Sequence, residues 1–276
     1  MRVNALVRFD EGGSLLIDIH SHLLYGVDDG PSNVTSCLDM VKSALASNTT
    51  HIIVTPHHMR GGYNNPKETV IQKTTELQAL LQEQNLSITL FPGQEITLTS
   101  QLIAEFQQDR LLTLNHSRYM LIELPHDHIP KYTEEYMHEL KVYGIVPIIA
   151  HPERNQEIWM NPERLGHLVD CGALSQVTAS SLSGASGKKM QLLALKLCKQ
   201  SRVHCIASDA HGAVNRPYGL AAAYAVITQY LGEASSAYFM QNAQRILDNE
   251  MIPEMPDSSI NPINPIHRIR RWFNKE

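Results

Sequence analysis

The chain has 276 residues, close to the roughly 250 residues of a single α/β barrel. Apolar residues make up 43% of it and charged residues 18%, so we expect a sizeable core and no extensive disorder. The net charge of −5 argues against a nucleic-acid-binding protein with a broad basic face. Histidine is unusually frequent, at 14 residues, which suggests a metal site without locating one.

The sequence shows no signal for export, membrane insertion or a disulfide framework. No run reaches the about 18 apolar residues of a membrane span, and the charged first 14 residues do not resemble a signal peptide. The four cysteines form no C-x-x-C pair, which argues against a zinc ribbon. We therefore expect a reduced, cytoplasmic protein.

Seven short apolar runs, each the length of a buried strand, alternate with segments of helical periodicity. The predicted strands are residues 15–19, 51–55, 87–91, 119–122, 146–150, 174–178 and 203–207. The predicted helices are residues 34–47, 68–84, 132–143 and 187–199, and Asn65-Pro66 and Asn161-Pro162 are typical of helix starts. This alternation predicts a parallel sheet, and seven units favour a closed or nearly closed barrel over a doubly wound sheet.

We expect one domain over residues 15–250, preceded by an extension at 1–14. Residues 251–265 contain four prolines and are typical of a linker. Residues 267–275 are basic and aromatic, which indicates either a solvated tail or a segment for peripheral contact with a membrane surface or a partner.

Metal-ligand residue types follow six of the seven predicted strands. In order they are His20 and His22 with Asp28 and Asp29; His57 and His58; Glu95; Glu123; His151; and Asp209 and His211. Only the sixth strand lacks an obvious ligand. Because the active site of a parallel α/β protein lies at the carboxyl ends of its strands, we expect these side chains to meet.

The mixture of imidazole and carboxylate suits Mn, Zn, Fe or Mg, and its size suits two or three ions rather than one. Closely spaced metal ions are the usual device for phosphate-ester hydrolysis. Arg154 and Arg216 each follow a ligand-bearing strand end, and a guanidinium group matches the phosphate fork. Each is therefore a candidate phosphate-binding residue, with a surface position or a structural ion pair as the alternative.

Other candidate catalytic residues have weaker support. His204-Cys205 resembles the start of a cysteine-phosphatase loop, but position 211 is His where that loop needs Arg, so Cys205 is expected to be a small buried strand residue. His58 is adjacent to a candidate ligand and is expected to border the pocket. His126 and His128 either line the mouth of the pocket or belong to an exposed loop.

The motifs themselves resemble a known family. Asp18-Ile19-His20-Ser21-His22 with Asp28-Asp29-Gly30 is similar to the opening motif of the polymerase and histidinol phosphatase (PHP) superfamily. Its later motifs follow in order as Thr55-Pro56-His57-His58, Pro92-Gly93-Gln94-Glu95, Ala150-His151-Pro152-Glu153-Arg154 and Ala207-Ser208-Asp209-Ala210-His211. The details resemble most the manganese-dependent bacterial tyrosine-protein phosphatases encoded with capsule and exopolysaccharide genes, over roughly residues 16–247.

The resemblance implies a distorted (β/α)7 TIM-like barrel of the PHP fold, with two or three divalent ions, Mn²⁺ foremost. It implies that His20, His22, Glu95 and Asp209 hold one ion, and that Glu95 bridges to a second near His57 and His151. Asp29, preferred to Asp28 because the family uses the acid next to the glycine, would complete the cluster with Glu123 and His211. Arg154 and Arg216 correspond to the family's phosphate-binding arginines, and His211 is a further candidate proton donor.

The implied activity is hydrolysis of phosphotyrosine on proteins, the substrate being the tail of a bacterial tyrosine kinase and related proteins, with control of polysaccharide export as the result. Two alternatives remain open from the residues. One is a small-molecule phosphatase of the histidinol-phosphatase type, and the other is a non-catalytic partner module with a structural metal cluster. Structural metal sites are normally closed and lack substrate-binding arginines, so Arg154 and Arg216 count against the second alternative.

Overall fold

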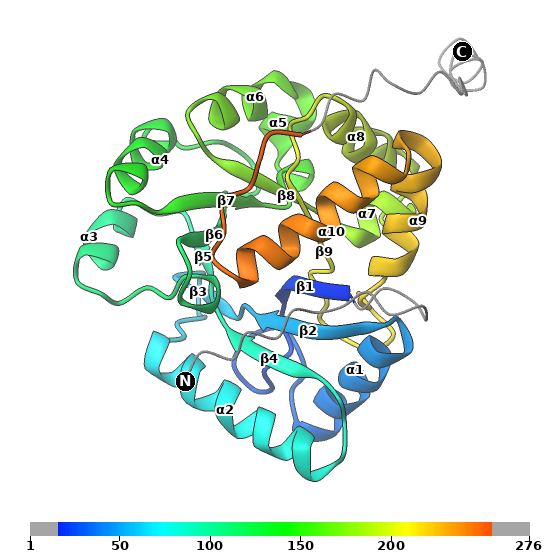
Figure 1. The fold of residues 1–276 in the computed structure, drawn as a ribbon. Coiled ribbons are helices and arrows are strands. Elements are labelled where there is room, and N and C mark those ends of the chain that lie inside the picture. The colour runs from blue at the N-terminus through cyan, green and yellow to red at the C-terminus, as the bar shows by residue number, and fades with distance from the viewer. Residues whose placement is uncertain (1–15, 256–276) are drawn as a thin grey trace.

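The computed structural model describes residues 16–255, in which nine strands pair in parallel within two sheets (Figure 1). The three-stranded sheet has the order β1-β2-β4, and the six-stranded sheet has the order β3-β5-β6-β7-β8-β9. The strands are β1 (Leu16–Ser21), β2 (Thr49–Val54), β3 (His57–His58), β4 (Thr89–Pro92), β5 (Glu95–Thr97), β6 (Tyr119–Glu123), β7 (Val146–Ala150), β8 (Leu174–Thr178) and β9 (Cys205–Ala207). Each of the seven predicted runs overlaps one of them.

The two additional strands arise because two barrel strands are broken. Pro56 separates β2 from β3 and Gly93 separates β4 from β5, so each pair is one barrel strand whose second half joins the other sheet. The Glu95 amide still donates to the Pro56 carbonyl across the break, at 3.2 Å. A bridge between Ser21 and Ala210 connects the end of β1 to the segment after β9. The strands therefore close into a distorted seven-stranded barrel, which excludes the doubly wound alternative.

The four predicted helices are present, and no end is shifted by more than one residue. They are α1 (Val34–Ala46), α2 (Lys67–Glu83), α4 (Thr133–Val142) and α8 (Lys188–Lys199). Five helices were not predicted: α3 (Leu102–Gln107), α5 (Gln156–Met160), α7 (Ala179–Ser183), α9 (Leu220–Leu231) and α10 (Glu233–Leu247). Of α6 (Glu163–Asp170) only the start was predicted. Short 3-10 turns lie at Leu114–His116 and Pro152–Arg154.

The asparagines of the two Asn-Pro pairs were expected to cap the helices that follow them, but neither does so. In both cases the proline occupies the cap position, and no side chain caps the helix there. The Asn65 amide instead donates to the carbonyls of His57, at 2.8 Å, and Val27, at 3.1 Å. The Asn65 side chain therefore does not cap α2 but connects the start of this helix to the barrel.

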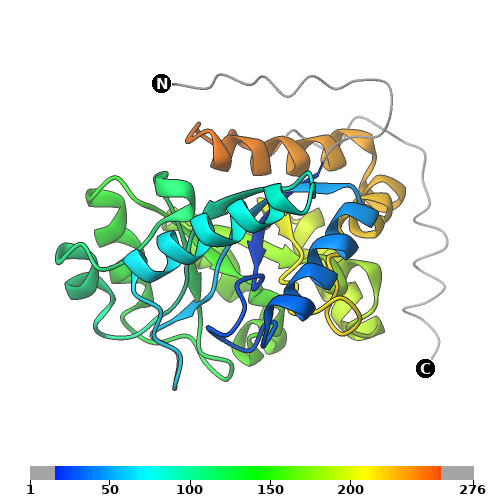
Figure 2. The ribbon, with the colours of Figure 1, turned by 90° about the horizontal axis from the view of Figure 1, so that it is seen from below.

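The amino-terminal end of the barrel is filled with apolar side chains and covered by α10. Ile19, Ile53, Leu121 and Ile148 are fully buried in one cluster with Ile246 of α10. Figure 1 shows α10 lying across the strands, and Figure 2 shows it as a separate layer along one side of the molecule. This packing leaves the carboxyl end of the barrel for polar side chains.

Among residues 16–255, no helix is long and apolar enough to cross a membrane. The predicted extension at 1–14 and most of the predicted linker and basic tail lie outside the described residues. Residues 251–255 form neither helix nor strand.

Candidate metal centre

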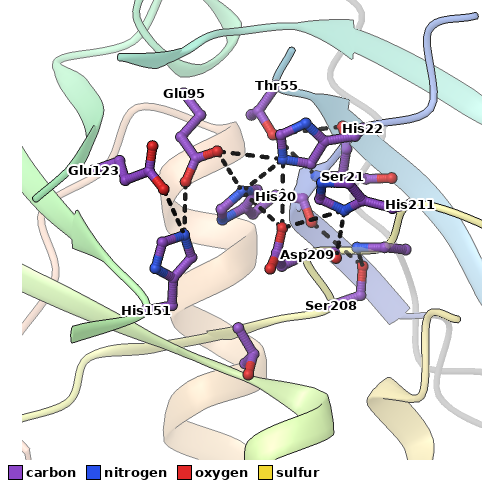
Figure 3. A network of polar contacts seen from close by, with 12 residues as sticks. His20, Ser21, His22, Thr55, Glu95, Glu123, His151, Ser208, Asp209 and His211 are labelled. Atoms are coloured by element: carbon purple, nitrogen blue, oxygen red, sulfur yellow. Dashed lines mark hydrogen bonds and ion pairs between the residues drawn. The ribbon is translucent and has the colours of Figure 1, made fainter. Parts of the chain in front are cut away.

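The sequence-predicted ligands converge at the carboxyl end of the barrel (Figure 3). His20 lies in β1, His57 in β3, and Glu95 and Glu123 at the start of β5 and the end of β6. The others follow strands directly: His22 after β1, Asp29 in the next loop, His151 after β7, and Asp209 and His211 after β9. All are buried except Asp29, whose side chain is 39% exposed.

Glu95 occupies the middle of this cluster. Its Oε2 lies 3.4 Å from His20 Nε2, 3.3 Å from His22 Nε2 and 2.8 Å from His57 Nδ1. Its Oε1 lies 2.8 Å from His151 Nε2. Burial alone would raise the pKa of Glu95, but the positive potential of His20 and the hydrogen bond from His151 hold that pKa well below its ordinary value.

Three groups of side chains each bring their ligand atoms within 4.8 Å of one another: His22, Asp29, His57 and His211; His20, His22 and Glu95; and His57, Glu95 and Glu123. Three buried atoms in the cluster make no hydrogen bond: Glu95 Oε2, Asp209 Oδ1 and His211 Nε2. Buried polar atoms are normally satisfied. Unsatisfied nitrogen and oxygen atoms within such groups of ligand-type side chains fit divalent metal ions of the borderline or hard type.

The two neighbouring aspartates have different positions. Asp28 Oδ2 lies 2.7 Å from His22 Nδ1 and accepts from the His57 amide at 3.1 Å. Asp29 Oδ1 instead lies 3.2 Å from His211 Nε2 and 3.4 Å from His57 Nε2. Asp28 thus orients a candidate ligand, whereas Asp29 faces the cluster. Only glycine fits at position 30, because a Cβ there would lie 2.2 Å from the His22 carbonyl oxygen.

The sixth barrel strand contributes a residue that the sequence analysis missed. Gln176 of β8 is fully buried, and its Oε1 accepts from His20 Nδ1 at 2.8 Å. This bond places the ring proton on Nδ1 and leaves Nε2 free to face the cluster. Glutamine is not a common ligand type, so a search for ligands after strand ends does not find it.

The segment that carries Asp209 is held in an unusual conformation. Asp209 has a φ of 54°, in the left-handed region that non-glycine residues seldom adopt. Buried Asp18 accepts from the Ser208 amide at 3.0 Å and from the Ser208 hydroxyl, and the Asp209 amide donates to the His20 carbonyl at 2.9 Å. Burial raises the pKa of Asp18 to about 6, although the Ser208 hydrogen bonds oppose the shift. Such conformations cluster at functional sites, where surrounding bonds hold them.

Both predicted arginines reach the centre from the Asp209 side. Arg154 Nη1 and Arg216 Nη2 each lie 2.5 Å from Asp209 Oδ2. Their side chains are 27% and 43% exposed, so both groups connect the buried cluster to solvent. Burial opposes ionisation of Asp209, but His20, His22 and Arg154 hold its pKa well below the ordinary range.

A third arginine at the centre was not predicted. Arg60 Nη1 contacts the His57 ring, lying 3.3 Å from Nδ1 and close to Nε2, and Arg60 Nε lies 3.5 Å from Glu123 Oε2. Arg60 follows the His57-His58 motif by two residues. Arg60 lies outside the recognised motifs. It would have been found by looking for positively charged residues directly after each strand end.

The weaker candidates lie outside the cluster. His58 is buried, but it belongs to none of the three ligand groups. His126 and His128 are exposed in the loop after β6, where their carbonyls accept from the Gln156 amide and the Asn155 side chain. Cys205 is fully buried in β9, and burial raises the pKa of its thiol. Cys205 is thus a strand core residue, as predicted, and is unsuited to thiolate catalysis.

A parallel α/β barrel with clustered imidazoles and carboxylates at the carboxyl ends of its strands defines a metal-dependent hydrolase of the TIM-like type. Residues 16–248 match the family described as "Capsular polysaccharide synthesis, CpsB/CapC". The chain belongs to this family.

Individual relatives agree with the family match. The chain is 41% identical over 261 residues to CapC of Staphylococcus aureus, covering 94% of this chain and 99% of that protein. It is 36% identical over 245 residues to tyrosine-protein phosphatase YwqE of Bacillus subtilis, covering 89% of this chain and 96% of that one. A solved structure from work on YwqE and CpsB of Streptococcus pneumoniae, described as unique metal-dependent tyrosine phosphatases, superposes with a TM-score of 0.85 at 36% identity. That match covers 87% of this chain and 98% of the solved one.

Proposed function

We propose that this protein is a metal-dependent protein-tyrosine phosphatase that acts in capsular or exopolysaccharide synthesis. The observation that carries the proposal is the centre itself, where unsatisfied imidazole and carboxylate atoms face one another beside two arginines. The relatives named as tyrosine-protein phosphatases supply the substrate class. A structural metal site would be closed to solvent, whereas Arg216 and Asp29 are 43% and 39% exposed here, which argues against the non-catalytic module.

The ligand groups, together with the contacts of Asp209 with His20 and of His151 with Glu95, suggest how two or three ions are held. His20, His22, Glu95 and Asp209 would hold one ion, and Glu95, His57, Glu123 and His151 a second. Asp29 and His211, with His22 or His57, would hold a third. We propose Mn²⁺ as the metal, with Fe, Zn and Mg as alternatives that suit the same ligand types.

The bound ions would supply an activated water and neutralise charge on the phosphoryl oxygens. Arg154 and Arg216 would exchange their contact with Asp209 for the phosphoryl oxygens, whose charge they stabilise as bidentate donors. The leaving phenol has an ordinary pKa of about 10, so its departure needs little help from an acid.

The role of His211 follows from its hydrogen bond. Its Nδ1 lies 3.0 Å from the Asp209 carbonyl oxygen, which can only accept, so the ring proton lies on Nδ1. In the neutral ring Nε2 then has a lone pair directed at the cluster. Burial and the nearby His22 lower the pKa of His211, which favours this neutral form. We therefore propose His211 as a metal ligand in preference to a proton donor.

The proposed substrate is a phosphotyrosine-bearing protein, in particular the tail of a bacterial tyrosine kinase in the cytoplasm. Arg216 and Asp29 are 43% and 39% exposed, and such an open metal centre suits a phosphotyrosine that is presented on a protein chain. We further propose that residues 15–250 form the catalytic domain, with 1–14 as an extension and 251–276 as a linker and basic tail.

The test is a metal-dependent phosphate-release assay. Protein stripped with chelator and reloaded with Mn²⁺ is offered a phosphotyrosine peptide, a phosphoserine peptide and histidinol phosphate, with His20→Ala as the inactive control. We expect release from the phosphotyrosine peptide only. Release from histidinol phosphate alone would establish the small-molecule alternative, and no release from any substrate would refute the enzyme assignment.

A further inference from the structure

A tight hairpin follows β3 beside the centre, and Arg60 is the last residue before its turn. The Arg60 amide donates to the Tyr63 carbonyl at 3.2 Å, and the Tyr63 amide donates back at 2.8 Å. Gly61 and Gly62 form the two-residue turn between them, and Gly61 has a φ of 52°. Glycine pairs are favoured in such turns because they adopt positive φ without steric cost.

The hairpin is fixed at its base and along one side. Asn65 anchors the returning chain through its bonds to the His57 and Val27 carbonyls, and Gln94 donates to the Asn65 carbonyl at 2.6 Å. The Tyr63 ring stacks on the His57 ring, with centroids 6.0 Å apart and planes at 19°. These contacts hold Arg60 next to the centre.

The present contacts of Arg60 conflict with the proposed role of His57. Its guanidinium faces both ring nitrogens of His57, which are the only atoms through which this ring can bind a metal ion. A guanidinium and a divalent cation cannot share one lone pair. In the metal-loaded protein the Arg60 guanidinium must therefore turn away from His57, and its 43% exposed side chain is free to do so.

In the present structure Arg60 lies on the Glu123 side of the centre, with its Nε 3.5 Å from Glu123 Oε2. Arg154 and Arg216 both lie on the Asp209 side. Figure 3 shows Glu123 and Asp209 on different sides of Glu95, so positive charge flanks the centre from two directions. A tetrahedral dianion above the centre has oxygens that point both ways, and arginine is well suited to bind them.

We propose that Arg60 is a third phosphate-binding arginine, which contacts the phosphoryl group of the substrate from the Glu123 side. This inference rests on the proposed function, because it names a further residue for the same substrate group. The proposed role of Arg60 in phosphate binding differs from a structural role, in which Arg60 would only neutralise Glu123 or support His57.

The test measures binding of orthophosphate, the reaction product, to the Mn²⁺-loaded protein by titration calorimetry and as an inhibition constant. Arg60→Gln removes the charge of a 43% exposed side chain next to the hairpin turn. Arg110→Gln is the matched control, because Arg110 is 47% exposed and paired with Glu105. We expect orthophosphate to bind about tenfold more weakly to Arg60→Gln, with unchanged metal content, because a charge-assisted hydrogen bond is lost. Arg110→Gln should bind it as the parent protein does.

Unchanged orthophosphate affinity in Arg60→Gln would overturn the proposal, even if the KM for a phosphopeptide rises, since Arg60 would then recognise the peptide. A loss of bound Mn²⁺ would also overturn it, because Arg60 would then act through Glu123 or His57. Hydrolysis of phosphotyrosine by the parent protein is measured separately, so failure of this inference leaves the proposed function standing.

Discussion

Two residues that belong to none of the three ligand groups determine how the His20 and His22 rings face the centre. Gln176 accepts from Nδ1 of His20, and Asp28 contacts Nδ1 of His22 at 2.7 Å. Both rings therefore direct Nε2 inward, and the two Nε2 atoms lie 3.2 Å apart. Supporting residues of this kind commonly fix the tautomer and the orientation of metal-binding histidines.

Replacing Gln176 should weaken metal binding without removing a ligand. In Gln176→Leu the Nδ1 proton of His20 loses its acceptor, so we expect Mn²⁺ affinity to fall by about 10- to 100-fold. Calorimetric titration of the chelator-stripped protein measures this directly. Gln176→Glu retains the acceptor and serves as the control. Affinity in Gln176→Leu equal to that of the parent protein would show that the ring needs no such support.

Arg216→Lys separates positive charge from bidentate geometry. Lysine keeps the charge near Asp209 but lacks the planar fork that matches two phosphoryl oxygens. We expect kcat/KM for a phosphotyrosine peptide to fall at least about tenfold, a loss of about 1.4 kcal/mol of transition-state stabilisation, with the metal content intact. Arg110→Lys should leave both quantities unchanged. A normal rate in Arg216→Lys would mean that charge alone suffices at this position.

At this scale the sequence predicts positions better than roles. The rule that sites lie at the carboxyl ends of parallel strands gives eleven candidates, and the family resemblance reduces them to nine metal ligands, all of which the structure brings together. Asp28 and Asp29 cannot be separated from residue type, because their difference lies in the loop conformation around Gly30. Gln176 acts through a side-chain contact that the spacing rule does not encode, whereas Arg60 lies just after a strand end but outside the recognised motifs.

Among the elements, short length hides several from the sequence, although α9 and α10, of 12 and 15 residues, were also missed. Strands of five or six residues give a clear apolar run, whereas β3 and β5 are two- and three-residue continuations beyond a break. The breaks at Pro56 and Gly93 depend on packing: a Cβ at Gly93 would lie 2.9 Å from the Ile53 side chain. Helices α5 and α7 have five residues each, too few to show a helical period.

The start of β9 should make the fold sensitive to acid. Burial, together with the nearby Arg202, lowers the pKa of His204 to about 4, and the Ser175 amide donates to its Nδ1. The folded state thus favours the neutral ring, while the unfolded chain takes up a proton near pH 6.5. Stability is therefore retained above that pH and lost as the pH falls toward about 4.

We expect the free energy of unfolding to decrease by about 1 kcal/mol from this group between about pH 7.5 and pH 5.5. Urea unfolding of the chelator-stripped protein at the two pH values measures the change. His204→Gln should show a correspondingly smaller decrease. An equal decrease in both proteins would assign the acid sensitivity to other groups.

In the whole molecule, stability and chemistry occupy opposite ends of the barrel. The apolar cluster with Ile246 fills the end under α10, and the charged cluster fills the end that bears the loops. This division follows from the alternation of strands and helices, which is why the barrel could be predicted from the sequence. Helices α9 and α10 come after the last predicted strand and were missed, although α10 closes the barrel.

Mn²⁺ should stabilise the folded protein as a whole. An ion that binds only the folded state contributes about 2.7 kcal/mol at a free concentration of 100 times its Kd. For a domain of this size that corresponds to a rise in Tm of roughly 5–10 °C. Thermal scans with Mn²⁺ and with excess chelator provide the measurement, and Asp209→Ala should lose most of the difference. Identical Tm values under both conditions would contradict binding at this centre.

The break in the barrel strands has a mechanical consequence. His20 belongs to the three-stranded sheet, while His57, Glu95 and Glu123 belong to the six-stranded sheet, so the seam between the sheets runs through the ligand cluster. An ion held by His20 and Glu95 would be a cross-link between the two sheets. Loss of metal should then loosen this joint first, while the opposite end, held by α10, stays closed.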